Sequence, residues 1–315
     1  MGSLIARRLL GLIPVLLLVS FGVFALVTIV PGDAATKIAG GESATRERIA
    51  EVREELGLDD PLAVQYGRWL GDAVRLDLGD SLVTGRSVTE EIRSRLPITL
   101  SIAGAAIAVG VLIGVPAGVL AGTRPGGAVD RVLLLATSAG IAVPNFVLAL
   151  VLVTLFAVNL SWFDPVGFTR ITESPVDWLR SVTLPAIALG TWSAASLARQ
   201  IRAGLIDVMG TAYVRTAWAK GGTPRLVVGK HALKNAAIPA LTILGLQFGA
   251  LLGGTVIIEQ IFSIPGLGGY LVRSIVDFDL PVIQGVTIVF VLTYVLINLA
   301  VDVAYGWLNP TVRVS

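Results

Sequence analysis

Five long apolar runs constrain the fold of this chain more than any other feature of its sequence. Each holds about twenty or more consecutive, mostly hydrophobic residues, and a helix of roughly 20 such residues crosses a bilayer. Runs of this length are typical of membrane spans rather than of soluble domains. The sequence therefore predicts an all-α membrane protein. The runs extend from Leu9 to Val30, Ile98 to Gly122, Val132 to Val158, Ala236 to Ile258 and Leu280 to Tyr305.

Composition agrees with a membrane protein and excludes several kinds of chemistry. Of the 315 residues, 54% are hydrophobic and only 15% are charged, and the mean hydropathy is +0.81. The net charge of +2 does not suggest a nucleic-acid partner. The chain has no cysteine and one histidine, His231. Disulfides, cysteine-ligated metals and multi-histidine metal or haem sites are therefore excluded, and we expect no metal site.

A weaker run, Val182 to Ala198, decides the topology. It is short and contains Pro185, but the distribution of positive charge favours a span. With it, six helices cross the membrane, both termini are cytoplasmic, and the inside segments hold 12 Lys and Arg against three in the two short outside loops. Without it, the basic segment Arg199 to Asn235 would lie outside. We therefore predict six transmembrane helices.

Four regions follow from this topology. Residues 1–30 form the cytoplasmic N-terminal end and the first span, and residues 31–97 form an extracytoplasmic helical insert. Residues 98–305 hold spans two to six, with a cytoplasmic loop at 199–235, and residues 306–315 form a cytoplasmic tail. In the insert, Thr45 and Gly57 bound one short amphipathic helix and Pro61 begins a second. A locally folded cap is favoured over a catalytic role.

Glycine and proline patterns predict how the spans pack. Small residues at intervals of four lie on one helix face and permit close approach of a neighbouring helix. Such a stripe either packs one compact bundle or slides when a pore opens, and sequence does not separate the two. Mid-span prolines predict kinks or local unwinding. The glycines are Gly110, Gly114, Gly118 and Gly122, then Gly245, Gly249 and Gly253, and the prolines are Pro116 and Pro144.

Polar side chains within the spans are few, and the chain offers no catalytic constellation. Buried amides normally face a bundle interior or a wet cavity, so Asn145, Gln247 and Gln284 are the candidate pore-lining residues. The mid-span positions hold no ionisable groups for a proton relay. No phosphate-binding GxxxxGK[ST], HExxH or GxSxG motif occurs. We therefore predict no catalytic residue, no bound cofactor and no enzyme activity in this chain.

The segment Arg199 to Asn235 is the most informative polar stretch. It carries seven Lys and Arg against one acid, Asp207. Gly221-Gly222 would end a helix begun near Thr211, and Pro224 suits the first turn of another. Two short helices joined by a sharp turn make a compact knob that can seat in a partner's groove. The alternative is that the basic residues only obey the positive-inside rule and touch anionic lipid.

The same segment resembles the cytoplasmic loop of binding-protein-dependent ABC importer permeases, in the form of the dipeptide/oligopeptide/nickel branch. The resemblance covers nearly the whole chain, and the order and spacing of its motifs are specific. The matching segments are Tyr213 to Gly221, His231 to Asn235 with Ile238-Pro239, Arg7 to Leu10 with Ile13-Pro14, Pro31 to Asp33, Leu56 to Asp59 with Pro61, Gln65-Tyr66, Asp77 to Gly79 with Ser81, Phe262 to Gly268, and Leu308 to Pro310.

This resemblance implies a fold, partners and contact residues. The fold would be that of a type I importer permease in the cytoplasmic (inner) membrane of a prokaryote. The partners would be a second permease subunit, two ATPase domains or subunits that bind ATP and Mg, an extracytoplasmic substrate-binding protein and membrane lipid. The loop contacts with the ATPase would involve Tyr213, Val214, Arg215, Thr216, Ala217, Lys220, Gly221, Gly222 and His231. The outer loop facing the binding protein would include Glu259, Pro265, Gly266 and Gly268.

The expected cargo is a short peptide, with nickel chelates and glutathione-like compounds as alternatives within the branch. Three departures from the family pattern occur. Thr211-Ala212 stand where an acid commonly precedes the tyrosine, Arg215 stands where the wider family has Glu, and Ala34 replaces a proline. A different class, the self-sufficient secondary transporter, would need inverted repeats and ionisable residues at mid-membrane depth. Neither is clear in this sequence.

Overall fold

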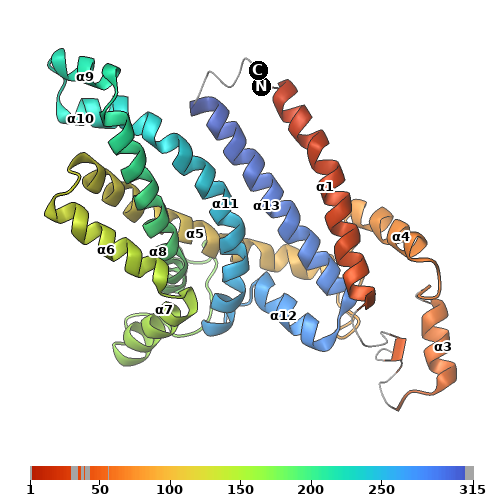
Figure 1. Ribbon diagram of the computed structural model, residues 1–315. Helices are drawn as coiled ribbons and strands as arrows, with labels where there is room; N and C mark the ends of the chain where they lie inside the picture. Colours follow the sequence, from red (N-terminus) through yellow and green to blue (C-terminus); the bar gives the residue numbers. More distant parts are fainter. Residues whose placement is uncertain (1, 30–34, 37–38, 40–42, 56, 309–315) are drawn as a thin grey trace. The chain divides into compact units, whose positions relative to one another are not determined.

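The computed structural model describes residues 2–29, 35–36, 39, 43–55 and 57–308. Among these residues the regular secondary structure is helical, and the β pairing is an isolated antiparallel bridge between Asp80 and Ser87. The helices are α1 Gly2–Ile29, α3 Arg46–Glu55, α4 Leu62–Val74, α5 Val88–Thr123, α6 Ala128–Ala142, α7 Asn145–Leu152, α8 Pro175–Met209, α9 Ala212–Ala219, α10 Pro224–Leu226, α11 Leu233–Ile261, α12 Leu267–Asp277 and α13 Leu280–Leu308, with π-helical segments η2 Val153–Asn159 and η3 Val227–Ala232 (Figure 1).

The chain forms two compact units. The first contains Ile98–Pro265 and Leu296–Ser315, and the second contains Gly2–Pro97 and Gly266–Val295. Helices α5 and α13 contribute residues to both units. Motifs that fall at Pro31–Asp33, Ala34 and residues 309–315 lie outside the described residues.

Long apolar helices coincide with the predicted runs. Among the described residues, four helices are long and apolar enough to cross a membrane, namely α5, α8, the continuous stretch Pro224–Ile261 and α13. The pair α6 and α7–η2 becomes a fifth span if it is counted as one. Helix α1 adds a shorter apolar stretch, Ile13–Ala25. The weak run at Val182 to Ala198 thus lies within one 35-residue helix, α8.

The first unit is built around α8, which packs closely against α5. A Cβ added at Gly114 would stand 2.6 Å from the carbonyl oxygen of Ala194, and one at Gly118 would meet Ala198 at the same distance. Gly110 and Gly122 face the same helix at comparable distances. The four-residue glycine stripe on α5 is therefore a contact face where two backbones touch, as predicted.

The second glycine stripe is only partly a contact face. Gly245 on α11 faces Asn298 and Val301 of α13, where an added Cβ would lie 3.1 to 3.3 Å from their side chains. Gly253 has nothing within 4 Å. Neighbouring Gly254 is the residue that approaches another helix, with Leu189 of α8 at 3.0 Å. The spacing rule identified one helix face well and the other incompletely.

The two mid-span prolines behave differently. At Pro144 the chain turns by 97° between α6 and α7, which confirms a kink in the apolar run Val132 to Val158. At Pro116 helix α5 continues without interruption, so the prediction of local unwinding was wrong there, and a kink at Pro116 stays a prediction. Val143 takes an extended conformation before Pro144, as the residue before a proline prefers, and this ends α6. No sequence pattern around Pro116 or Pro144 distinguishes the proline that breaks its helix from the one that does not.

Three features fix the local structure of the second unit. Helix α4 packs on α1 through an aromatic cluster in which Tyr66 contacts Phe21 and Phe24 edge-on, and the Tyr66 and Ser20 hydroxyls lie 2.7 Å apart. Thr45 accepts a hydrogen bond from the Arg48 backbone N–H and begins α3, as predicted for an N-cap. A separate apolar core joins α5, α12 and α13 and contains Val88, Ile92, Leu267, Val282 and Val286.

Candidate functional site

The predicted knob is present between α8 and α11. Thr211 precedes α9, Thr223 precedes α10, and η3 leads from α10 into α11, so the whole excursion spans fewer than 25 residues. In the first unit, α9 and α10 lie together beyond one end of α8 and α11 (Figure 1). The two short helices and the turn between them confirm the element pattern expected from Thr211, Gly221 and Pro224.

Backbone hydrogen bonds close the turn after α9. The Gly221 N–H donates to the Trp218 carbonyl at 2.9 Å and the Gly222 N–H donates to the Ala217 carbonyl at 3.1 Å. Gly221 has φ +80°, in the left-handed region. This pair of bonds with a left-handed glycine is the Schellman motif, which satisfies carbonyls left open at a helix C-terminus. The Gly221-Gly222 pair therefore ends α9 through backbone geometry.

Gly222 is required for a different reason. A Cβ at this position would lie 2.7 Å from Cγ2 of Val227 and 2.8 Å from the Ala217 carbonyl oxygen. Val227 is fully buried at the start of η3. The second glycine thus lets α9 and η3 approach each other, and the first lets the chain turn.

One tyrosine ties α9 to the start of α11. The Asn235 side-chain amide donates to the Tyr213 hydroxyl at 2.7 Å, and that hydroxyl donates to the His231 carbonyl oxygen at 3.4 Å. Val214 on the same helix is fully buried, whereas Tyr213 keeps 43% of its surface exposed. The motif residues Tyr213, His231 and Asn235, which are separated in sequence, therefore meet in the structure.

The rest of the predicted contact set is mainly solvent-facing. Arg215, Thr216, Lys220 and Gly221 are exposed, while Ala217 and His231 are half-buried. Arg215 donates to the Gly210 carbonyl at 3.0 Å, which keeps its guanidinium beside the knob. An exposed, basic surface on a rigid turn can receive a partner protein.

A buried ion pair anchors the base of α8. The Arg202 guanidinium makes two hydrogen bonds to the Asp130 carboxylate, at 2.5 and 2.8 Å, and the Gly126 N–H adds a third at 2.8 Å. The Asp130 side chain is 2% exposed and that of Arg202 is 24% exposed. This clamp joins the turn between α5 and α6 to the helix that leads into the knob. Two-point binding to a carboxylate fixes orientation as well as distance.

Sequence reasoning missed this clamp. Arg202 was counted only among the basic residues of Arg199 to Asn235, and Asp130 was not considered. Their pairing joins residues 72 positions apart, so no local pattern contains it. The available signal was an acid placed just before an apolar run, opposite a basic segment on the same predicted side.

The three candidate pore-lining amides occupy different surroundings. Gln247 on α11 is 3% exposed and accepts a hydrogen bond from the Ser193 hydroxyl of α8 at 2.6 Å. Asn145 begins α7 and lies near Gly254 of α11. Gln284 is 7% exposed and belongs to the second unit. Gln247 and Asn145 thus lie in the first unit, and the pore-lining role of all three stays a prediction.

The outer-loop candidates are mostly covered. Glu259 is 1% exposed and accepts a hydrogen bond from the Thr99 hydroxyl at 2.6 Å. Gly266 and Gly268 are buried, and Pro265 is exposed. The structure also contains a helix in this loop, α12, that the sequence reasoning did not assign. Its signal was the apolar face of Leu267 and Leu271, one helical turn apart.

Comparison with known proteins identifies the class to which these helices belong. Residues 114–314 match the family described as "Binding-protein-dependent transport system inner membrane component". Residues 1–103 match the corresponding N-terminal membrane component. The match spans both the helices around α8 and the N-terminal segment that resembled this family in sequence. The class is thus that of membrane components of transport systems.

Relatives of similar length support the same assignment. "Putative peptide transport system permease protein" of Brucella abortus (strain 2308) is 41% identical over 313 residues, covering 99% of each chain. "Glutathione transport system permease protein GsiC" of Escherichia coli (strain K12) is 42% identical over 309 residues, covering 98% of each. This chain belongs to the family of binding-protein-dependent inner membrane transport components, as an ABC importer permease of the dipeptide/oligopeptide type.

A solved structure agrees on the fold. The methionine ABC transporter MetNI, in an inward-facing conformation, contains a chain that matches with a TM-score of 0.57 at 20% identity. The match covers 69% of the present chain and 96% of that chain. At this identity the likeness concerns the fold alone.

Proposed function

We propose that this chain is one permease subunit of an ATP-driven importer and that its knob receives the movement of separate ATPase subunits. The observation that carries the proposal is the rigid, exposed α9–α10 turn, shaped by Gly221 and Gly222 and held to α11 by Tyr213. The chain contains no nucleotide-binding motif of its own. ATP and Mg would therefore bind to the partner subunits, and this chain would carry no cofactor.

The proposed topology has six spans with both termini and the knob in the cytoplasm. Helix α1, α5, the α6–α7 pair, α8, α11 and α13 would be the six. The basic residues of Arg199 to Asn235 support this orientation through the positive-inside rule. A second permease subunit, two ATPase domains and an extracytoplasmic binding protein would complete the importer. Residues 31–97 would lie on the outer side as a helical insert.

Short peptides are the proposed cargo. The names of full-length relatives at 41% and 42% identity refer to peptide and to glutathione transport, and glutathione is itself a small peptide. Glutathione import is therefore the nearest alternative, and nickel-chelate import is a more distant one. Cargo can be delivered by the binding protein, so the permease alone does not specify it.

Uptake by a deletion strain would test the proposal. The strain would carry the wild-type chain or Gly221→Asp, and uptake of di- and tripeptides, glutathione and nickel would be measured. A matched control is Gly167→Asp, because Gly167 also has positive φ and an added Cβ there meets nothing within 4 Å. We expect Gly221→Asp to reduce uptake strongly and Gly167→Asp to retain it.

Purification of the complex provides the second readout. The wild-type chain should copurify with ATPase subunits, and the Gly221→Asp chain should lose them or lose coupling between hydrolysis and uptake. A wild-type complex that lacks an ATPase, or a Gly221→Asp variant with normal uptake, would contradict the proposal. If the deletion strain loses nickel uptake but retains peptide uptake, the proposal that the cargo is a short peptide is wrong.

A further inference from the structure

Helix α4 of the second unit contacts α1 far from the end of the apolar run of α1. The Tyr66 hydroxyl lies 2.7 Å from that of Ser20 and donates a hydrogen bond to the Leu17 carbonyl at 3.2 Å. The apolar run extends to Val30, so Ser20 lies about 15 Å along the helix from the end of that run. The hydrocarbon core of a bilayer is about 30 Å thick. If α1 spans the bilayer, a cap held entirely in the water above it could not make these contacts.

Aromatic rings extend the contact between α4 and α1. Tyr66 lies edge-on to Phe21 and Phe24, with 5.3 and 5.7 Å between ring centroids. Trp69, one turn further along α4, stacks on Tyr66 at 6.1 Å. Tyrosine and tryptophan are enriched at membrane–water interfaces, where one end of the ring is apolar and the other is wet. The composition of this cluster is therefore typical of an interfacial contact.

The chain that follows α4 is fixed at the ends of two other long helices. Asp279, the residue before α13, accepts hydrogen bonds from the Ser81 hydroxyl at 2.5 Å and from the Leu82 N–H at 3.1 Å. Val88, the first residue of α5, is fully buried in the core that joins α5, α12 and α13. The proposed topology places these ends of α5 and α13 on the outer side. Helix α4 is thus held between the apolar part of α1 and the outer ends of α5 and α13.

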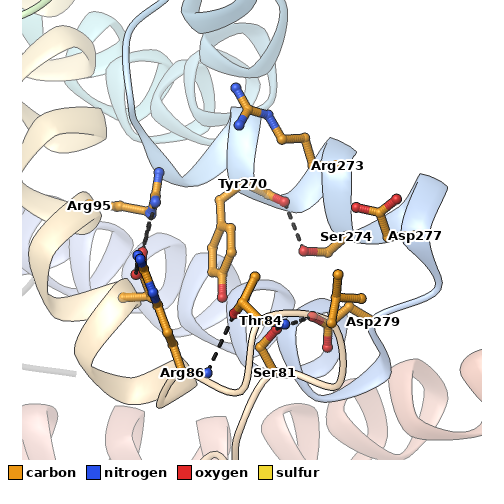
Figure 2. A pocket seen from close by; sticks show the side chains of 11 residues that line it. Ser81, Thr84, Arg86, Arg95, Tyr270, Arg273, Ser274, Asp277 and Asp279 are labelled. Atoms are coloured by element: carbon orange, nitrogen blue, oxygen red, sulfur yellow. Dashed lines mark hydrogen bonds and ion pairs between the residues drawn. The ribbon is translucent and has the colours of Figure 1, made fainter. Parts of the chain in front are cut away.

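Side chains at this joint surround a polar pocket of about 350 Å³, the pocket around Tyr270 (Figure 2). The Glu91 carboxylate lies 2.7 Å from the Arg95 guanidinium and 3.2 Å from that of Arg86. The Arg95 guanidinium stands 4.7 Å from the centre of the Tyr270 ring, in cation–π geometry. These contacts join the segment after α4 to α5 and α12, and so they restrict where α4 can lie.

The exposed surface of α4 has one uncharged side and one charged side. Residues three or four positions apart share a helix face. On the uncharged side, Val74 is 77% exposed, and a Cβ added at Gly67 or Gly71 meets nothing within 4 Å. The uncharged side consists of Ala63, Val64, Gly67, Gly71 and Val74, and the charged side consists of Arg68, Asp72 and Arg75. A helix surrounded by water would carry polar residues over its whole open surface.

The charged side is suited to the headgroup region. Arg68 forms an ion pair with Asp60, and the Arg75 guanidinium lies 3.8 Å from the Asp72 carboxylate. Long arginine side chains near a membrane extend their charged ends toward the interface. Amphipathic helices with basic residues on the polar side lie in the plane of the interface, with the apolar side in the acyl boundary.

We propose that α4 is an interfacial helix whose uncharged side lies against the acyl chains of the outer membrane leaflet. Arg68 and Arg75 then lie at the phospholipid headgroups. The inference rests on the proposed topology, because the orientation of α1 sets the depth of α4. It makes part of the insert 31–97 a membrane-contacting element, and it removes this side of α4 from the surfaces available to a binding protein.

Spin labels in the full complex would test the proposal. The chain has no cysteine, so each introduced cysteine is unique in it, and cysteines of the partner subunits would be replaced. Gly71→Cys and Val74→Cys label the uncharged side of α4. Leu18→Cys, 74% exposed on α1, is the bilayer control, and Glu54→Cys, exposed on the highly charged α3, is the water control. The complex would be placed in nanodiscs of phosphatidylethanolamine and phosphatidylglycerol.

The measurement is the relaxation of each label by oxygen, which concentrates in hydrocarbon, and by a neutral nickel chelate, which concentrates in water. We expect oxygen to have the stronger effect at Leu18→Cys, Gly71→Cys and Val74→Cys, and the nickel chelate to have the stronger effect at Glu54→Cys. If the nickel chelate has the stronger effect on both α4 labels while Leu18→Cys reports hydrocarbon, α4 lies in water. The inference is then wrong and the orientation of α1 stands.

The remaining outcomes are also decisive. If Leu18→Cys reports water, the proposed topology of α1 is wrong, and the inference is wrong with it. If neither reagent reaches the α4 labels, another protein covers this side and the lipid proposal is wrong. Repeating the measurement without the binding protein then shows whether the binding protein or the second permease subunit is the cover. Copurification of ATPase subunits tests the proposed coupling separately, because its failure would leave the oxygen preference of the α4 labels unchanged.

Discussion

The knob after α8 and the pocket around Tyr270 are both exposed polar features, but they are built in opposite ways. The knob is assembled within one short stretch of chain, by backbone hydrogen bonds from Gly221 and Gly222. The pocket joins segments nearly 200 residues apart through side chains, chiefly Asp279 and Glu91. The knob depends on two positions that carry no side chain. The pocket depends on the charge of the side chains that form it.

This difference predicts which substitutions each region tolerates. In the knob, an added methyl group should be more harmful than a changed charge. In the pocket, loss of one charge should matter more than a change in backbone preference. The clamp between Asp130 and Arg202 lies on the helix that leads into the knob, but like the pocket it is built from side chains. It therefore tests whether the location of a feature or the way it is built decides its tolerance to substitution.

The largest effect is expected at Gly222. Gly222→Ala places a Cβ within 2.8 Å of the Ala217 carbonyl and of Val227, so α9 and η3 must separate. We expect peptide uptake to fall about tenfold or more, because overpacking at a tight contact displaces the surrounding backbone. The measurement is peptide uptake by the deletion strain that carries the Gly222→Ala chain.

Gly229 supplies the control in the same loop. An added Cβ there meets nothing within 4 Å, and Gly229 lies in a helical segment where alanine is favoured. Gly229→Ala should therefore retain uptake. Equal losses at Gly222 and Gly229 would show that uptake responds to any substitution in the loop, whatever space surrounds the glycine.

The next largest effect is expected at the clamp. Arg202→Gln leaves the buried Asp130 carboxylate without its cation, and removing one partner of a buried ion pair is among the larger single-residue effects. We expect the Tm of the complex to fall by about 5 °C. Arg199→Gln, an exposed arginine one turn earlier on α8, should leave the Tm unchanged. If Arg202→Gln leaves the Tm unchanged, the ion pair contributes less to the protein than the backbone contacts of the knob.

A smaller effect is expected at Glu91. Its carboxylate is partly shielded and holds Arg86 and Arg95, so Glu91→Gln should lower the free energy of unfolding by roughly 1 kcal/mol, the upper end of what surface ion pairs contribute. Glu90→Gln, an exposed neighbour on the same helix, should cost nothing measurable. The free energy of unfolding of both variants would be measured by denaturation in the same detergent. An equal decrease for Glu91→Gln and Glu90→Gln would argue against an ionic network around Glu91.

The smallest change is spectroscopic. The folded-state pKa of Tyr270 is raised to about 12 by burial, above the usual value of 10.0. Its protonated form is therefore favoured in the folded state, and the associated stability is present below pH 10 and lost as the pH rises through 12. The difference in tyrosinate absorbance between wild type and Tyr270→Phe should titrate near pH 12. A midpoint near 10 would indicate an exposed hydroxyl and a wetter pocket.

Features encoded locally were predictable from sequence. The apolar runs, Thr45 as an N-cap, the Gly221-Gly222 stop and the glycine face of α5 each lie within a few helical turns, and the structure confirms them. Helix α12 escaped because its apolar face is too short to stand out beside long hydrophobic runs. The absence of unwinding at Pro116 was missed because a proline's effect on a helix depends on the packing around it as well as on its own ring.

Pairings between distant segments were not predictable. Only the packing of helices brings together the pairs Asp130 with Arg202 and Ser81 with Asp279. In the sequence, these residues are ordinary charged or polar residues. The same holds for Glu259, which sequence placed on an outer loop and the structure buries beside Thr99. A single chain carries no covariation from which such contacts could be read.

The bend at Pro144 has a consequence for the lipid that surrounds this protein. A hydrocarbon tail offers no hydrogen bonds, so backbone groups freed where a helix breaks cannot face the acyl chains. In the proposed six-span topology, the 97° turn between α6 and α7 therefore marks a patch at membrane depth from which lipid is excluded. Protein or water must cover the backbone at this turn. A spin label placed at the turn should therefore report a polar or protein-packed environment, in contrast to labels on the lipid-facing surface of the neighbouring helices.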